Sequence, residues 1–167
     1  HFVKILIFDQ KYLIKKLDFW REFIGDGSSY FSLSLDKTRP SQLDFSGKEH
    51  CFKVDKQLAL KVRKLAQKNN LSVYILLLSS FKILLYKYTN EKEFIIGSPS
   101  SPRQSEEIEK VIGLFLNILP LKSTFKEGMN FESFLQLTRN HVLEAYEHQD
   151  IPFEQLVDYL GIERNLQ

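Results

Sequence analysis

The chain has 167 residues, of which 43% are hydrophobic and 13% aromatic, enough apolar material for one folded domain with a core. Its 23 basic and 21 acidic residues give a formal charge of +2 and are interspersed, which argues against nucleic acid or an anionic membrane as a partner. The longest apolar runs are much shorter than the roughly 20 residues that a membrane-spanning helix needs. A single cysteine, Cys51, excludes a disulfide framework or a cysteine zinc site within the chain.

The N-terminal segment gives two expectations about the setting of the protein. Residues 1–16 have lysines after an apolar stretch and no small-residue cleavage site, so they do not resemble a secretory signal. The chain starts with His1 and not with methionine, and we therefore expect a segment of a longer polypeptide. With a single cysteine and no such signal, the default expectation is a reducing, cytoplasmic location.

The first predicted element is a long amphipathic helix over residues 4–24. Apolar residues recur there at three- and four-residue spacing on one face: Phe8, Tyr12, Leu13, Leu17, Trp20 and Ile24. The stretch "GDGSS" (25–29) ends the helix, because glycine adopts positive φ cheaply and serine and aspartate favour turns. Residues 30–49 have no helical period and contain Pro40 and Gly47, so we expect an extended segment that crosses a surface.

The middle of the chain predicts a strand followed by two helices. "HCFKV" (50–54) alternates enough to be a strand, and Asp55 is a candidate N-cap for a helix over 56–70. Ser72 is a candidate N-cap for the next helix, which extends to residue 90. The nearly continuous apolar character of that second helix predicts burial on most sides.

Two strands are predicted next. "EFIIGSP" reads as a buried strand stopped by Gly97 and Pro99. "LFLNILPLKSTF" (114–125) is a second strand, in which Pro120 requires an edge position or a bulge because proline has no N–H to donate.

Two helices complete the chain. Asn130 is a candidate cap for a helix that extends to residue 149, and a short helix follows with Pro152 in its first turn and Gly161 as its stop. The whole order alternates helices with strands, and this alternation predicts an α/β sandwich in which helices cover a sheet.

Histidine is the usual proton carrier near neutral pH, and the chain has four: His1, His50, His141 and His148. His141 and His148 are seven residues apart on one predicted helix and could share a face. No third ligand lies near them at zinc spacing, so we expect no metal site.

Other catalytic patterns are absent from the sequence. No G-x-S-x-G motif provides a serine nucleophile, and "GDGSS" lacks the lysine of a phosphate-binding loop. The polar stretch "EHQDIPF" (147–153) is explained locally, since Asp150 and Pro152 are typical of a helix start. The residues alone therefore predict an α/β unit without a self-sufficient catalytic set.

Two segments resemble signature motifs of the condensation domains of nonribosomal peptide synthetases. "IGLFLNILPL" (112–121) is similar to I-G-x-F-x-N-x-L-P-L, and "HQDIPFEQLV" (148–157) to H-Q-D-x-P-F-E. "KKLDFWREFIG", "LDKTRP", "FIIGSPSSPRQSEEIEKVIG" and "LGIERN" resemble further segments in the family's order. The resemblance runs from about Lys15 to the C-terminus.

The resemblance implies a chloramphenicol-acetyltransferase-like α/β fold, a two-layer sandwich in two lobes. Residues 1–48 would be the end of the first lobe and 49–167 part of the second. Between the lobes, a tunnel admits the phosphopantetheine arms of donor and acceptor carrier proteins, and an amine attacks a thioester to form a peptide bond. The active-site motif H-H-x-x-x-D-G is absent from this sequence, so we expect no catalytic residue in the chain and no activity from it alone.

Motif correspondence also implies tunnel residues. Asn117 matches an asparagine that faces the tunnel and whose amide could donate to a thioester carbonyl, and Phe115 lies beside it. Asparagine is also common at irregularities of strands, and the tunnel role is favoured over this structural one. Arg103 remains from the family's A-G-R segment, while Arg164 matches a late arginine of structural or tunnel-lining character.

The trio His148, Gln149 and Asp150 matches H-Q-D, for which shaping a loop near the tunnel is favoured over chemistry. Two other functions stay open: a non-catalytic module that binds carrier proteins, and an acyltransferase of the same fold that uses coenzyme A. No cofactor or metal is expected to bind the chain directly. The expected partners are carrier proteins, an adenylation domain and the rest of the condensation domain, and exposed apolar surface predicts self-association.

Overall fold

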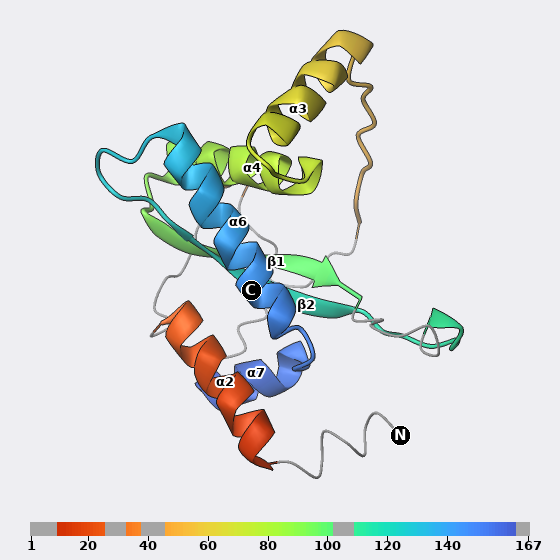
Figure 1. Ribbon diagram of the computed structural model, residues 1–167, viewed down its shortest axis with the longest axis vertical. Helices are drawn as coiled ribbons and strands as arrows, with labels where there is room; N and C mark the ends of the chain where they lie inside the picture. The colour runs from red at the N-terminus through yellow and green to blue at the C-terminus, as the bar shows by residue number, and fades with distance from the viewer. Residues whose placement is uncertain (1–9, 26–32, 38–45, 102–108, 163–167) are drawn as a thin grey trace.

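The computed structural model describes residues 10–25, 33–37, 46–101 and 109–162. Its elements are α2 (Gln10–Ile24), α3 (Lys56–Lys68), α4 (Val73–Thr89), β1 (Glu93–Ser100), β2 (Asn117–Thr124), α6 (Phe131–Glu147) and α7 (Phe153–Leu160). Helix α6 lies across the two-stranded sheet, α2 and α7 lie side by side near one end, and α3 projects beyond α4 (Figure 1). Helices therefore cover a sheet, as the alternation of elements predicts.

The predicted helix boundaries are confirmed where local chemistry sets them. The side chains of Asp55, Ser72 and Asn130 each accept a hydrogen bond from backbone N–H groups in the first turn of their helices. Gly25 and Gly161 follow the last residues of α2 and α7 with φ of +82° and +65°. These left-handed conformations close each helix at little steric cost because glycine has no Cβ.

Strands β1 and β2 pair antiparallel along their whole length, with Gly97 opposite Pro120 and Ser100 opposite Asn117. The prediction that Gly97 and Pro99 stop the first strand is wrong, because both lie inside β1. A proline ends a strand only where its missing N–H belongs to a ladder hydrogen bond.

The position of the prolines on the outer edges explains this tolerance. The carbonyl of Lys122 accepts a hydrogen bond from the Lys82 ammonium and so faces away from β1. Residues two apart in a strand point their backbone groups to the same side, so Pro120 also faces outward. Residues that lie opposite each other in the two strands point their backbone groups either both outward or both inward. By this alternation, the nitrogen of Pro99 lies on the outer edge of β1. The predicted edge position of Pro120 is thereby confirmed.

The prediction of a strand at residues 50–54 is wrong. These residues adopt no regular structure, their side chains are exposed, and the sheet in the described part of the chain has two strands only. An alternating pattern gives a strand only where a partner strand offers its backbone groups.

Helix α4 is not buried on most sides. Its large apolar residues at three- and four-residue spacing form a stripe with exposed fractions between 38% and 77%, here called the α4 stripe: Val73, Leu77, Phe81, Leu84 and Tyr88. In the described ranges, no single helix is long and apolar enough to cross a membrane; α3 and α4 pass that test only together, across a bend of 100°.

The core joins one face of the sheet to the helices. Leu119 and Leu121 from β2 pack in one cluster with residues of α2, α4, α6 and α7: Leu17, Trp20, Ile24, Ile75, Leu76, Leu78, Leu135, Val142, Ala145 and Leu156. Helix α2 thus shares a core with the elements after residue 49, while the assignment of residues 1–48 to another lobe stays a prediction.

A lysine lies within this packed region. Lys82 on α4 is fully buried, and its ammonium donates to the carbonyl oxygen of Lys122 at 2.8 Å. Burial lowers the pKa of Lys82 from 10.5 to about 8, because the charged form loses its hydration inside the protein. The sequence pattern marked this position only as part of an apolar helix.

The buried lysine predicts a specific pH dependence of stability. The folded state disfavours the charged form, so the free energy of unfolding should rise as pH increases from about 8 toward 10.5. At about 1.4 kcal/mol per pH unit, the rise reaches roughly 3 kcal/mol. Urea unfolding of Lys82→Met should lack this rise, whereas Lys87→Met, exposed on the same helix, should keep it. If the free energy of unfolding rose equally with pH in the unchanged chain and in both variants, Lys82 would not be the source of the rise.

Candidate functional site

The loop between α6 and α7, residues 148–152, contains the H-Q-D trio and is here called the H-Q-D loop. The side chain of Asn117, the first residue of β2, holds this loop through three hydrogen bonds. Its Nδ2 donates to the carbonyls of Gln149 at 2.9 Å and Ile151 at 2.8 Å. Its Oδ1 accepts from the backbone N–H of Phe153 at 3.0 Å, where α7 begins.

These bonds determine what the Asn117 amide can do. A primary amide has two N–H donors, and both are committed to backbone carbonyls of the same chain. Donation to a thioester carbonyl, as motif correspondence implies, would require the loop to release at least one of them. The position of Asn117 and half-buried Phe115 along a tunnel stays a prediction.

The side chains of Gln149 and Asp150 are also paired within the chain. Gln149 Oε1 accepts from the hydroxyl of Ser100 at 2.6 Å, which joins the loop to the end of β1. Asp150 accepts from the Tyr12 hydroxyl at 2.8 Å and forms an ion pair with Lys16 at 3.1 Å. The hydrogen bond to Asp150 raises the pKa of Tyr12, because a phenolate would lose it and face a carboxylate.

His148 is held on both its ring and its backbone. Its ring stacks on Phe19 with centroids 3.5 Å apart and planes 9° from parallel, and its Nδ1 lies 2.9 Å from the carbonyl of Glu144. The indole N–H of Trp20 donates to the His148 carbonyl at 3.1 Å. Pro152 then takes the N-cap position of α7, one residue before the predicted first turn, with φ of −60°.

The contacts with α2 come from one face of that helix. Tyr12, Lys16 and Trp20 are spaced four residues apart, so they lie in a row along the helix and meet the loop together. The predicted helix contains this spacing, but nothing in its pattern indicates that the row would meet a loop so distant along the chain. Arg103 and Arg164 lie outside the described residues.

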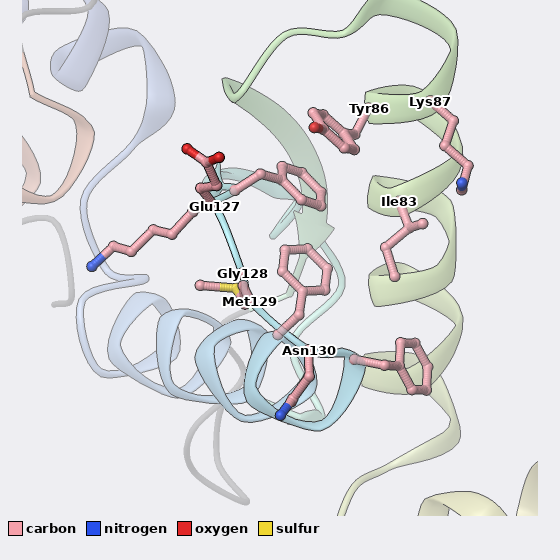
Figure 2. A pocket seen from close by; sticks show the side chains of 11 residues that line it. Ile83, Tyr86, Lys87, Glu127, Gly128, Met129 and Asn130 are labelled. Carbon is pink, nitrogen blue, oxygen red and sulfur yellow. The ribbon is translucent and has the colours of Figure 1, made fainter.

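A cavity elsewhere does not coincide with this loop. About 470 Å³ in volume and open to solvent, it is lined by α4, the turn before α6 and the first turn of α6 (Figure 2). One wall is a stack of aromatic rings, with centroids 4.4 Å apart for Tyr86 and Phe125 and 4.5 Å apart for Phe125 and Phe134. None of the predicted site residues lines it, so the H-Q-D loop remains the candidate site.

The geometry joins the two segments that resemble condensation-domain motifs, since Asn117 of the first bonds to the second. A family model described as "Condensation domain" matches residues 7–167. The chain belongs to the condensation-domain family. Bacitracin synthase 2 of Bacillus licheniformis is 34% identical over 154 residues, which cover 92% of this chain and 6% of that protein. Gramicidin S synthase 2 of Brevibacillus brevis is 34% identical over 159 residues, which cover 95% and 4%.

Solved condensation domains share the fold of this segment. Holo-AB3403, a four-domain nonribosomal peptide synthetase bound to AMP and glycine, superposes with a TM-score of 0.84 at 24% identity, over 89% of this chain and 11% of that chain. The first condensation domain of the CDA synthetase gives 0.81 at 14% identity, over 95% and 34%. The predicted chloramphenicol-acetyltransferase-like α/β fold is confirmed. This condensation-domain segment spans only a few per cent of the curated synthetases it matches.

The bonds of Asn117 predict a large stability effect. Asn117→Ala should lower the free energy of unfolding by roughly 2 to 4 kcal/mol, because it leaves two carbonyls and one N–H without partners in a half-buried site. Asn117→Asp keeps the acceptor for Phe153 and should still lose stability, since its oxygen would face two carbonyls.

Urea unfolding measures both variants against Asn140→Ala, an exposed position on α6 expected to change stability by no more than about 0.5 kcal/mol. An Asn117→Ala protein as stable as the Asn140→Ala control would show that the loop does not depend on this amide.

Proposed function

We propose that this segment belongs to an enzyme that forms a peptide bond between aminoacyl and peptidyl thioesters held on carrier proteins. The observation that carries the proposal is the direct bonding of one motif to the other. Asn117 in "IGLFLNILPL" binds three backbone groups of "HQDIPF", so the two motifs form a single structural unit. The match to the family over residues 7–167 supports the same function.

The chemistry assigns a limited role to this segment. Attack of an amine on a thioester needs a group that keeps the amine nucleophilic and donors that stabilise the tetrahedral oxyanion. We propose that a segment with H-H-x-x-x-D-G elsewhere in the longer polypeptide supplies the group that keeps the amine nucleophilic. Residues 49–167 would provide part of the second lobe, with Asn117, Phe115 and the H-Q-D loop shaping the tunnel wall.

The proposed reaction requires several partner domains. Donor and acceptor carrier proteins would present their thioesters on phosphopantetheine arms, and an adenylation domain in the same polypeptide would load the amino acid. The rest of the condensation domain would complete the tunnel, with no metal and no cofactor bound by this segment itself. A cytoplasmic setting fits these partners.

Product formation tests the function. Carrier proteins loaded with a donor and an acceptor are mixed with the 167-residue chain or with a longer polypeptide that includes H-H-x-x-x-D-G, and mass spectrometry detects the condensed product. We expect product only from the longer polypeptide. Within it, Asn117→Ala should slow condensation by about tenfold or more, equivalent to about 1.4 kcal/mol in the barrier, and leave amino-acid adenylation unchanged.

Either of two outcomes would contradict the proposal and favour another function. Carrier proteins that bind without any product from the longer polypeptide would indicate a non-catalytic binding module. Product formed from free coenzyme A thioesters without a carrier protein would indicate the coenzyme A-dependent acyltransferase.

The α4 stripe adds a prediction about the segment on its own. We propose that the rest of the domain covers these residues and that the isolated chain therefore self-associates through them. In sedimentation velocity, the average mass should rise with concentration. Leu77→Glu with Phe81→Glu should reduce that rise, while Leu143→Glu, at an exposed position of α6, should not. A monomer at every concentration would contradict this proposal.

A further inference from the structure

A continuous row of four aromatic rings joins α2 to α6, here called the aromatic row: His148, Phe19, Phe23 and His141. His148 stacks on Phe19, and Phe19 stacks on Phe23 with centroids 5.5 Å apart. Phe23 then meets the ring of His141 edge to face at 5.3 Å and 76°. His141 lies on α6 and His148 is the C-cap of that helix, so Phe19 and Phe23 of α2 bridge two points on α6, one of them in the H-Q-D loop.

At the His141 end, the aromatic row meets a partly buried pair of hydrogen bonds. His141 Nδ1 lies 3.2 Å from the carbonyl oxygen of Lys122, which also accepts from Lys82 at 2.8 Å. The two nitrogens therefore lie within about 6 Å of each other. A carbonyl can only accept, so Nδ1 of the neutral ring carries the hydrogen and an added proton would go to Nε2.

The charges around His141 come from three elements. Lys82 faces it from α4, Lys122 from β2, and Glu144 from one turn further along α6, while α2 contributes the uncharged ring of Phe23. Among the described residues, no carboxylate forms an ion pair with the imidazole. Burial, reinforced by the two lysines, outweighs Glu144 and the hydrogen bond to Lys122, and lowers the pKa of His141.

We propose that His141 is an acid-sensitive positioning residue, which in its neutral form holds the aromatic row together and on protonation releases α2 from the H-Q-D loop. Protonation places a second positive charge beside Lys82, with both groups directed at one carbonyl oxygen. Because burial disfavours the charged ring, we expect the imidazolium to move toward water, which would remove the ring that Phe23 packs against. The inference concerns the segment itself and does not depend on the proposed function.

Protonation of His141 lowers the stability of the folded state. Because the folded state lowers the pKa of His141, its contribution to stability is fully present above about pH 6.5. The contribution is lost as pH falls from there toward the lowered pKa.

The chain contains its own reporter of this junction. Trp20 is the single tryptophan in the sequence, is 1% exposed, and donates its indole N–H to the His148 carbonyl. Its ring also lies edge-on to Phe19 and Phe23. Release of α2 would expose the indole to water and shift its fluorescence emission to longer wavelength.

Trp20 emission and far-UV circular dichroism are recorded on the 167-residue chain from about pH 8 to about pH 4.5, the range in which histidine titrates. We expect a red shift of the emission with a midpoint below pH 6.5, while the helical signal stays constant. His141→Phe keeps a ring without a titratable nitrogen and should abolish the shift. His141→Gln, which keeps a donor for the carbonyl, provides the same comparison if the phenylalanine does not fit.

His50→Phe, at an exposed histidine, is the matched control and should keep the wild-type midpoint. Three results would overturn the inference: no emission change over the whole range, an unchanged midpoint in both His141 variants, or a helical signal lost in parallel with the emission. The last of these would mean that acid unfolds the whole segment and does not release α2 alone.

Discussion

The three hydrogen bonds of one asparagine fix the relative positions of β2, the end of α6 and the start of α7. The H-Q-D loop has carbonyls that point inward at the end of a helix, where no intrahelical donor is available. Asn117 supplies two donors and one acceptor at the first residue of β2, and this arrangement satisfies all three groups. The loop then offers a fixed surface on which Trp20 and Phe19 of α2 pack. A side chain that motif correspondence places at a reaction centre thus serves the architecture first.

Features decided by neighbouring residues were predictable from the sequence. Asp55, Ser72 and Asn130 cap their helices as predicted, because a cap depends only on its own side chain and the next three residues. Features decided by distant residues were not. Residues 50–54 have the alternation of a strand without a paired partner, and Pro99 is tolerated in β1 because its nitrogen faces the outer edge.

In the candidate site, too, the sequence indicated the residues but not the distant partners that they contact. The motif resemblance located Asn117 and the H-Q-D trio, but their bonding partners lie 32 to 36 residues apart for Asn117 and 138 residues apart for Tyr12 and Asp150. Periodicity placed Tyr12 and Trp20 on one helical face without indicating what that face would meet. The sequence showed Lys82 only as one residue of an apolar helix. Its importance follows from its burial and its hydrogen bond to the Lys122 carbonyl.

The two prolines of the sheet have a further consequence for the behaviour of the chain in solution. Pro120 removes one backbone donor from the outer edge of β2, and Pro99 removes one from the outer edge of β1. An incoming strand from another molecule would therefore meet a gap in the hydrogen-bond ladder on either side, a device by which natural sheets resist edge-to-edge aggregation. Lys82 and His141 already occupy the carbonyl of Lys122, between Pro120 and the end of β2. Edge-to-edge pairing of this sheet with a strand of another molecule is consequently disfavoured.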